Sequence, residues 1–208
     1  HWLKVRKRIL PGDSALGTYL LEQALERDFD PALSMELVLD HGFITPLELA
    51  GISGDIPIVP VLINCVQPPL PKMGRCYEFG QMLAQSLLND KTSKRVSVIA
   101  SGGISHDLST PRMGMINEAF DRQFIEHLRS GHAAQAIDHA TRQVHLAGNG
   151  AEEVRMWLMA MGMTQTLVAA GRVTHAVQGH APFELDFYQA MHGWFTGIGL
   201  GHWALECA

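Results

Sequence analysis

Short apolar runs that end in a polar turn carrying glycine and histidine constrain the fold of this chain more than any other feature. Leu33–Leu39 leads into Asp40-His41-Gly42, and Val96–Ala100 leads into Ser101-Gly102-Gly103-Ile104-Ser105-His106. Apolar runs of this length, bounded by turn residues, predict short buried strands. A third run, Ile56–Val66, is rich in β-branched residues and is also a strand candidate, although prolines interrupt it.

Helices are predicted between these strands. Apolar residues at helical spacing follow the turn at Pro11–Ser14 and continue through Arg27. The same spacing predicts helices over three further ranges, 75–88, 113–128 and 152–163. Strands that alternate with helices predict the α/β class, and we expect one domain over residues 1–208 with a mixed central sheet flanked by helices.

Composition narrows the kind of protein. The chain has 208 residues, 47% hydrophobic and 18% charged, with a formal net charge of −5, which is typical of a globular protein and gives no footprint for nucleic acid. No apolar stretch approaches the ~20 residues of a membrane span. Three widely spaced cysteines (Cys65, Cys76 and Cys207) form no disulfide framework, which favours a reducing, cytoplasmic location.

His41 and His106 are the strongest candidates for chemistry. Both lie where a predicted strand ends, and ligands of α/β sheets collect at the carboxyl ends of strands. Two imidazoles that face one pocket can act as base and acid near neutral pH. An equally good interpretation of His41 is a turn cap with Asp40 fixing its tautomer, and the loop before His106 could be only a tight turn.

Other polar residues have simpler explanations. Glu152 and Glu153 open a predicted helix, where most glutamates are solvated caps favoured by the helix dipole. Histidines 127, 132, 139 and 145 lie on polar helical stretches, which indicates surface positions. In the glycine-rich tail, Tyr188, His192 and Trp194 are expected to shape a substrate pocket, although aromatic packing is the commoner role.

Several motifs together resemble the class III extradiol ring-cleaving dioxygenases, and the resemblance extends from about Pro11 to about Gly201. The motifs that carry the resemblance are Asp40–Leu47, Pro60–Pro69, Ser101–His106, Thr110–Asn117, Phe120-Asp121 and Glu153–Leu158.

The resemblance implies a specific site. Members of this dioxygenase family cleave catechol-type rings with O2 and hold Fe(II) with two histidines and one glutamate. Glu153 matches the glutamate ligand, His106 the active-site base, and His41 the acid-type histidine. We therefore expect Fe(II) as cofactor, a catechol-type substrate and O2 as partners, and a homo-oligomer or a complex with a small second subunit.

The two motifs that supply the histidine ligands in this family are not found in the sequence. His1 is the only residue near the start that could be considered, and the ligand role is not assigned to it. The chain is therefore expected to begin within a domain. The alternative to an iron-dependent dioxygenase is an iron-free, non-catalytic subunit or aromatic-binding module on the same fold. A metal-dependent hydrolase is a weaker option, because no His-Glu-x-x-His signature is present.

Overall fold

The computed structural model describes residues 9–52, 54–92, 94–173, 176–177 and 179–205. His1, His175 and Cys207 lie outside the described residues. The chain divides into two compact units, residues 1–62 and 63–208, which are described separately. The expectation of one domain stays a prediction.

The first unit contains two helices joined by irregular chain. Helix α1 (Ser14–Leu25) begins where the side chain of Asp13 accepts a hydrogen bond from the backbone N–H of Leu16. Helix α2 (His41–Leu49) begins after Asp40, whose side chain accepts from the N–H of Gly42. An isolated parallel bridge joins Gly12 to Ile58.

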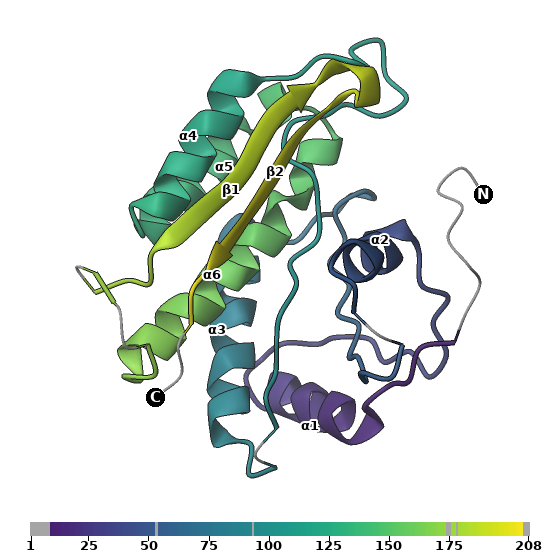
Figure 1. Ribbon diagram of the computed structural model, residues 1–208, viewed down its shortest axis with the longest axis vertical. Coiled ribbons are helices and arrows are strands. Elements are labelled where there is room, and N and C mark those ends of the chain that lie inside the picture. Colours follow the sequence, from purple (N-terminus) through teal and green to yellow (C-terminus); the bar gives the residue numbers. More distant parts are fainter. Residues whose placement is uncertain (1–8, 53, 93, 174–175, 178, 206–208) are drawn as a thin grey trace. The chain divides into compact units, whose positions relative to one another are not determined.

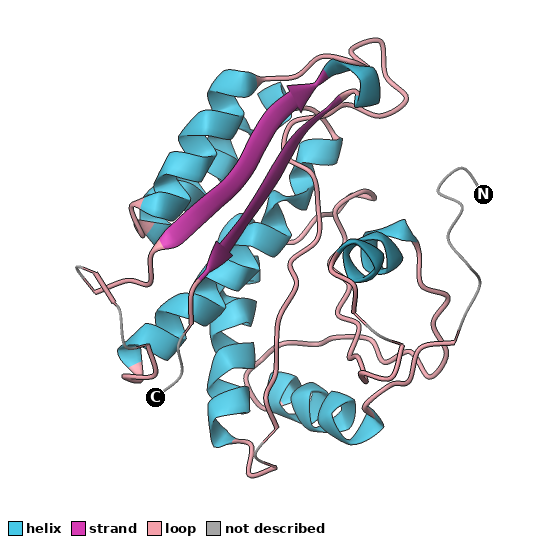
Figure 2. Ribbon diagram, viewed as in Figure 1, coloured by secondary structure: helices cyan, strands magenta, loops and turns pink. Residues whose placement is uncertain are grey.

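The second unit is a helical layer covered by a β-hairpin (Figures 1 and 2). Its helices are α3 (Met73–Asn89), α4 (Glu118–Arg129), α5 (Ala133–Ala147), the 3-10 turn η1 (Gly150–Glu153) and α6 (Val154–Ala169). Strand β1 (Phe183–Met191), the turn η2 (His192–Trp194) and strand β2 (Thr196–Trp203) form the hairpin. The strands are antiparallel, with Phe183 opposite Trp203 and Met191 opposite Thr196.

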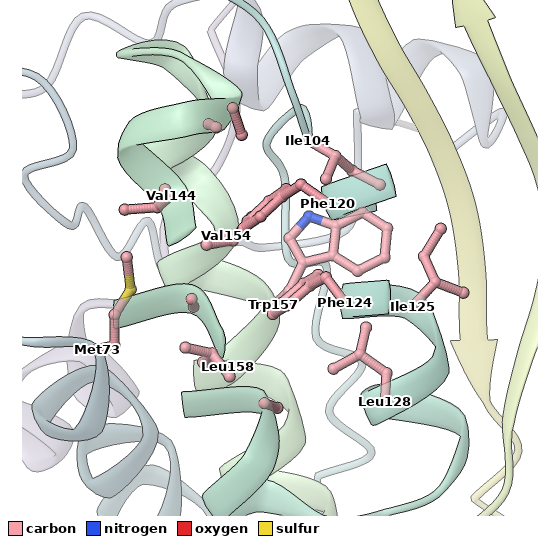
Figure 3. Packing of buried hydrophobic residues seen from close by; sticks show 14 of the residues in the cluster. Met73, Ile104, Phe120, Phe124, Ile125, Leu128, Val144, Val154, Trp157 and Leu158 are labelled. Carbon is pink, nitrogen blue, oxygen red and sulfur yellow. The ribbon is translucent and has the colours of Figure 1, made fainter. Parts of the chain in front are cut away.

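An aromatic core joins the helices of this unit to the hairpin. Helix α4 buries Phe120, Phe124 and Leu128, which are four residues apart and therefore lie on one face. Figure 3 shows Phe120 and Phe124 next to the indole of Trp157 on α6. The Trp157 ring also lies 6.2 Å from that of Phe183 at the start of β1, so the hairpin closes the core.

The four predicted helices are confirmed, with shifts at their ends. The helix predicted to end at residue 163 continues to Ala169 as α6. The helix predicted from residue 113 begins only at Glu118, because Asn117 caps it by accepting a hydrogen bond from the N–H of Phe120. None of the helices in the described ranges is long and apolar enough to cross a membrane.

The part of the chain that the structure describes is helix-rich with a small antiparallel sheet, which is consistent with the α/β class, but a central mixed sheet is not seen there. There, the only strands are β1 and β2, and residues 33–39, 56–66 and 96–100 are irregular apart from the bridge at Ile58. Prolines at 57 and 60 remove N–H donors from the second of these runs. Val96, Val98 and Ile99 are 43–48% exposed, so the third run lacks the burial that would stabilise a strand.

Candidate functional site

The loop Ser101–His106 carries the strongest candidate and is fastened to the start of β2. The N–H of Ile104 donates to the carbonyl of Gly197 (3.3 Å), and the N–H of Gly197 donates to the carbonyl of Ser105 (2.8 Å). The fully buried side chain of Ile104 anchors the loop in the aromatic core. His106 is therefore held on an irregular but well-fixed segment.

The His106 ring has a defined orientation. Its Nδ1 lies 3.0 Å from the carbonyl oxygen of Ile104. A carbonyl oxygen only accepts, so Nδ1 is the donor, and in the neutral ring Nε2 carries the lone pair. The residue is 9% exposed, and its ring lies against Gly103 and Gly150, where a Cβ atom would collide with it.

Glu153 lies against the same loop. It is the last residue of η1, and its Oε2 accepts a hydrogen bond of 2.5 Å from the N–H of Gly103. A Cβ on Gly102 would lie 2.8 Å from the Cβ of Glu153, and Gly102 also has a positive φ of 155°. The glycines thus allow the Glu153 carboxylate and the His106 loop to approach closely.

Glu152 has a different partner. Its carboxylate forms an ion pair with Arg155, which is buried and also donates to the carbonyl of Pro71 (2.7 Å). The Glu152 side chain is only 20% exposed, so it is not the solvated cap that its position at the start of a predicted helix suggested. The Arg155 guanidinium holds it instead.

Asp107, the residue after His106, and Asp121, which binds the preceding Ser105, are both buried carboxylates. Asp121 accepts from the N–H and the hydroxyl of Ser105, at 2.9 and 2.8 Å, and from the hydroxyl of Tyr188 at 2.7 Å. Asp107 accepts from Arg112 (2.8 Å) and Thr110 (2.8 Å). Burial raises the pKa of Asp121, although these three hydrogen bonds act to lower it.

The predicted pocket residues lie on the hairpin. Tyr188 is on β1, and its hydroxyl is bonded to Asp121. Burial and this bond raise its pKa. His192 and Trp194 are in η2 and exposed, with Trp194 at 71%. The turn precedes Thr196, which forms an isolated bridge with His106.

His41 belongs to the other unit. It is the first residue of α2 and is exposed, and Asp40 caps the helix rather than ending a strand. Its convergence with His106 on one pocket stays a prediction.

No group of three or more His, Cys, Asp or Glu side chains that could hold a metal ion occurs among residues 9–52, 54–92, 94–173, 176–177 and 179–205. Glu153 is the one predicted ligand in these ranges. An open cavity of about 600 Å³ lies elsewhere, lined by polar residues that include Tyr77, Gln81, Gln165, His132 and His180. Buried Cys65 is a poor nucleophile, because burial raises its thiol pKa to about 12.

Sequence reasoning did not identify Asp121 or Gly150 as parts of the His106 environment. Asp121 lies in the matching motif Phe120-Asp121, but its side chain could not be paired with Ser105 without the fold. Gly150 stands in a Gly-Asn-Gly turn, and nothing in that local sequence indicates that an imidazole packs against it.

Comparisons with known proteins show to which family the chain is related. The chain is 30% identical to the 2,3-dihydroxyphenylpropionate/2,3-dihydroxicinnamic acid 1,2-dioxygenase of Paraburkholderia xenovorans (strain LB400), covering 93% of this chain and 71% of the relative. It is 29% identical to the gallate dioxygenase of Pseudomonas putida, over 73% of this chain and 45% of that protein. Residues 1–186 match the family described as the catalytic LigB subunit of aromatic ring-opening dioxygenase, and the chain belongs to this family.

Proposed function

We propose that this protein catalyses extradiol cleavage of a catechol-type ring with O2, in a reaction that depends on Fe(II). The observation that carries the proposal is that the carboxylate of Glu153 is hydrogen-bonded to the loop that holds His106, in a chain from a ring-opening family. The orientation of His106 leaves Nε2 able to accept a proton in the neutral ring.

His106 is the proposed base. It would take a phenolic proton from the substrate at Nε2, because a deprotonated catechol is richer in electrons and reacts more readily with an oxidant. His41 is the proposed acid that returns a proton during ring opening. Tyr188, His192 and Trp194 are proposed to shape the substrate pocket.

Glu153 is the residue proposed to bind iron. One carboxylate does not make the three-ligand face that Fe(II) oxygenases use, and the described residues provide no such set. These residues alone therefore do not fit the metal.

Oxygen uptake tests the proposal. The purified chain is assayed with excess Fe(II) and with 2,3-dihydroxyphenylpropionate or gallate, the substrates named for its relatives. We expect uptake of O2 with one of them and its loss in His106→Gln, whereas the matched control His145→Gln, altered at an exposed histidine, retains it.

Equal activity of His106→Gln and the parent protein would remove His106 from the chemistry. Binding of the aromatic compound without O2 uptake would instead favour the iron-free binding module.

We also propose that the protein is cytoplasmic, and that it forms a homo-oligomer or associates with a small second subunit. Light scattering of the purified protein measures its molar mass and tests whether it forms a homo-oligomer.

A further inference from the structure

Asp121 and His106 are hydrogen-bonded to opposite ends of one peptide group. The N–H of Ser105 donates to Oδ1 of Asp121 at 2.9 Å. The carbonyl oxygen of Ile104, at the other end of the same peptide unit, lies 3.0 Å from Nδ1 of His106. A continuous chain of hydrogen bonds therefore runs from the carboxylate through the peptide to the imidazole.

We propose that Asp121 is a positioning residue that acts on His106 through the Ile104–Ser105 peptide group, as a carboxylate acts on an imidazole that it contacts directly. This inference rests on the proposed role of His106 as a base. It adds a residue for which the family resemblance implied no function.

The surroundings of Asp121 suit an ionised carboxylate. The side chain is fully buried, and the three partners that the structure gives it, two from Ser105 and one from Tyr188, all donate. An ionised carboxylate only accepts, so it matches three donors. Charge-assisted hydrogen bonds of this kind are roughly twice as strong as neutral ones.

Polarisation provides the coupling. Hydrogen bonds in a chain strengthen one another in a low-dielectric interior. A negative charge on the N–H end of the peptide makes the Ile104 carbonyl a stronger acceptor, and the bond from Nδ1–H strengthens. The His106 ring is then held in the tautomer with the lone pair on Nε2, the nitrogen that has to accept the substrate proton.

The fold keeps this chain of bonds rigid. A Cβ on Gly197 would overlap Oδ2 of Asp121, so the absence of a side chain there lets β2 cover the carboxylate. The hydroxyl of Ser105 also accepts a bond of 2.9 Å from the N–H of Asn117, the cap of α4. Asp121 is thus enclosed by α4, β1, β2 and the loop, which together fix its distance from Ser105.

The experiment measures the ring nitrogens of His106 by ¹⁵N NMR in the full chain, alongside kcat and KM for O2 uptake. In the parent protein we expect Nδ1 to be protonated. Asp121→Asn retains the shape of the side chain and removes its charge. We expect it to shift both ring resonances toward a mixture of tautomers, and to lower kcat about tenfold with KM unchanged.

Two matched variants separate the coupling from general damage. Asp107→Asn also removes a buried carboxylate next to His106, but Asp107 is bonded to Arg112 and Thr110 instead of the Ile104–Ser105 peptide. We expect Asp107→Asn to retain the ¹⁵N shifts of His106. Ser105→Ala removes one hydroxyl donor from Oδ2 of Asp121 and keeps the N–H bond, so we expect it to move the His106 resonances further toward the single tautomer, opposite to Asp121→Asn.

The outcomes distinguish this inference from the proposed function. A folded Asp121→Asn with unchanged His106 shifts overturns the coupling, even if the parent protein consumes O2. Shifts that move as expected, in a protein that never consumes O2, support the coupling and remove the function.

If Asp121→Asn does not fold, Tyr188→Phe provides the measurement. Without the Tyr188 hydroxyl, the Asp121 carboxylate shares its negative charge with one donor fewer, and its bond from the Ser105 N–H becomes stronger. The His106 resonances should then move in the opposite direction, further toward the single tautomer. Resonances that stay in place in this variant overturn the coupling.

Discussion

Gly150 leaves the space in which the His106 imidazole packs. A Cβ at this position would overlap the ring atoms. We expect Gly150→Ala to force the ring out of place and to lower the free energy of unfolding by about 1–3 kcal/mol, as overpacking does. Urea unfolding measures this, with Gly193→Ala as control because a Cβ there meets nothing within 4 Å. Equal stability of the two variants would show that the ring is not confined.

Arg112 neutralises the buried Asp107 beside His106. Desolvation acts to raise the pKa of Asp107, but the hydrogen bonds from Thr110 and Arg112 and the guanidinium charge lower it overall. A lowered pKa contributes stability above the unfolded value of about 3.9, and this stability is lost as pH falls through the folded value.

Arg112→Gln should therefore destabilise the protein by about 1–3 kcal/mol at pH 7, because it leaves a buried carboxylate without its cation. The difference from the parent protein should disappear as pH falls through the lowered pKa of Asp107, because the carboxyl group is then protonated in both proteins. Unfolding by urea across this range checks the prediction. Arg142→Gln is the control, because its ion pair with Asp138 is exposed and worth at most about 1 kcal/mol. A pH-independent difference would contradict this account.

Helices α3 and α6 cross at two glycines. A Cβ on Gly80 would overlap the carbonyl of Met159, and a Cβ on Gly162 would overlap that of Tyr77. Backbone-to-backbone approach of this kind leaves no side chain to move aside. We expect Gly162→Ala to lower the free energy of unfolding by about 1–3 kcal/mol or more, measured by thermal unfolding.

Gly74 provides the matched control on the same pair of helices. A Cβ there would meet Ile137 at an ordinary 3.8 Å. Gly74→Ala should be neutral or stabilising by up to about 1 kcal/mol, because alanine has the higher helix propensity. If Gly162→Ala proved as stable as Gly74→Ala, the backbones of α3 and α6 would have to lie further apart at Gly162 than they do in the structure.

Helices α1, α3, α4 and α6 were predictable from the sequence because their signals are local, whereas α2 was not predicted, since His41-Gly42 was interpreted as a turn after a strand. Asp13 and Asn117 cap α1 and α4, and the spacing of Phe120, Phe124 and Leu128 defines a buried face. Strands depend on partners distant in sequence, and Val96–Ala100 has the composition of a buried strand but finds no pairing partner among the described residues. The hairpin of β1 and β2 was missed because its glycines obscure the alternation.

The candidate site also combines features that a local sequence pattern indicates with contacts between residues distant in sequence. The motif around His106 and the choice of Glu153 came from a resemblance to known sequences, and the structure puts Glu153 against the His106 loop. The contacts of Asp121 with Ser105 and Tyr188 span 16 and 67 positions. No local pattern encodes such pairings, because they arise only when α4, the loop and β1 pack together.

Metal binding is a property of the whole molecule, since an Fe(II) site draws its ligands from distant segments. In the described residues Glu153 has no pair of metal ligands beside it, and it already accepts a bond from Gly103. One carboxylate competes poorly with water for Fe(II), so this 208-residue chain should bind the ion weakly, with a dissociation constant well above micromolar. An anaerobic Fe(II) titration followed by calorimetry measures this, with Glu153→Gln as the comparison. Stoichiometric micromolar binding that Glu153→Gln abolishes would contradict the prediction, because further ligands would then have to lie within the chain.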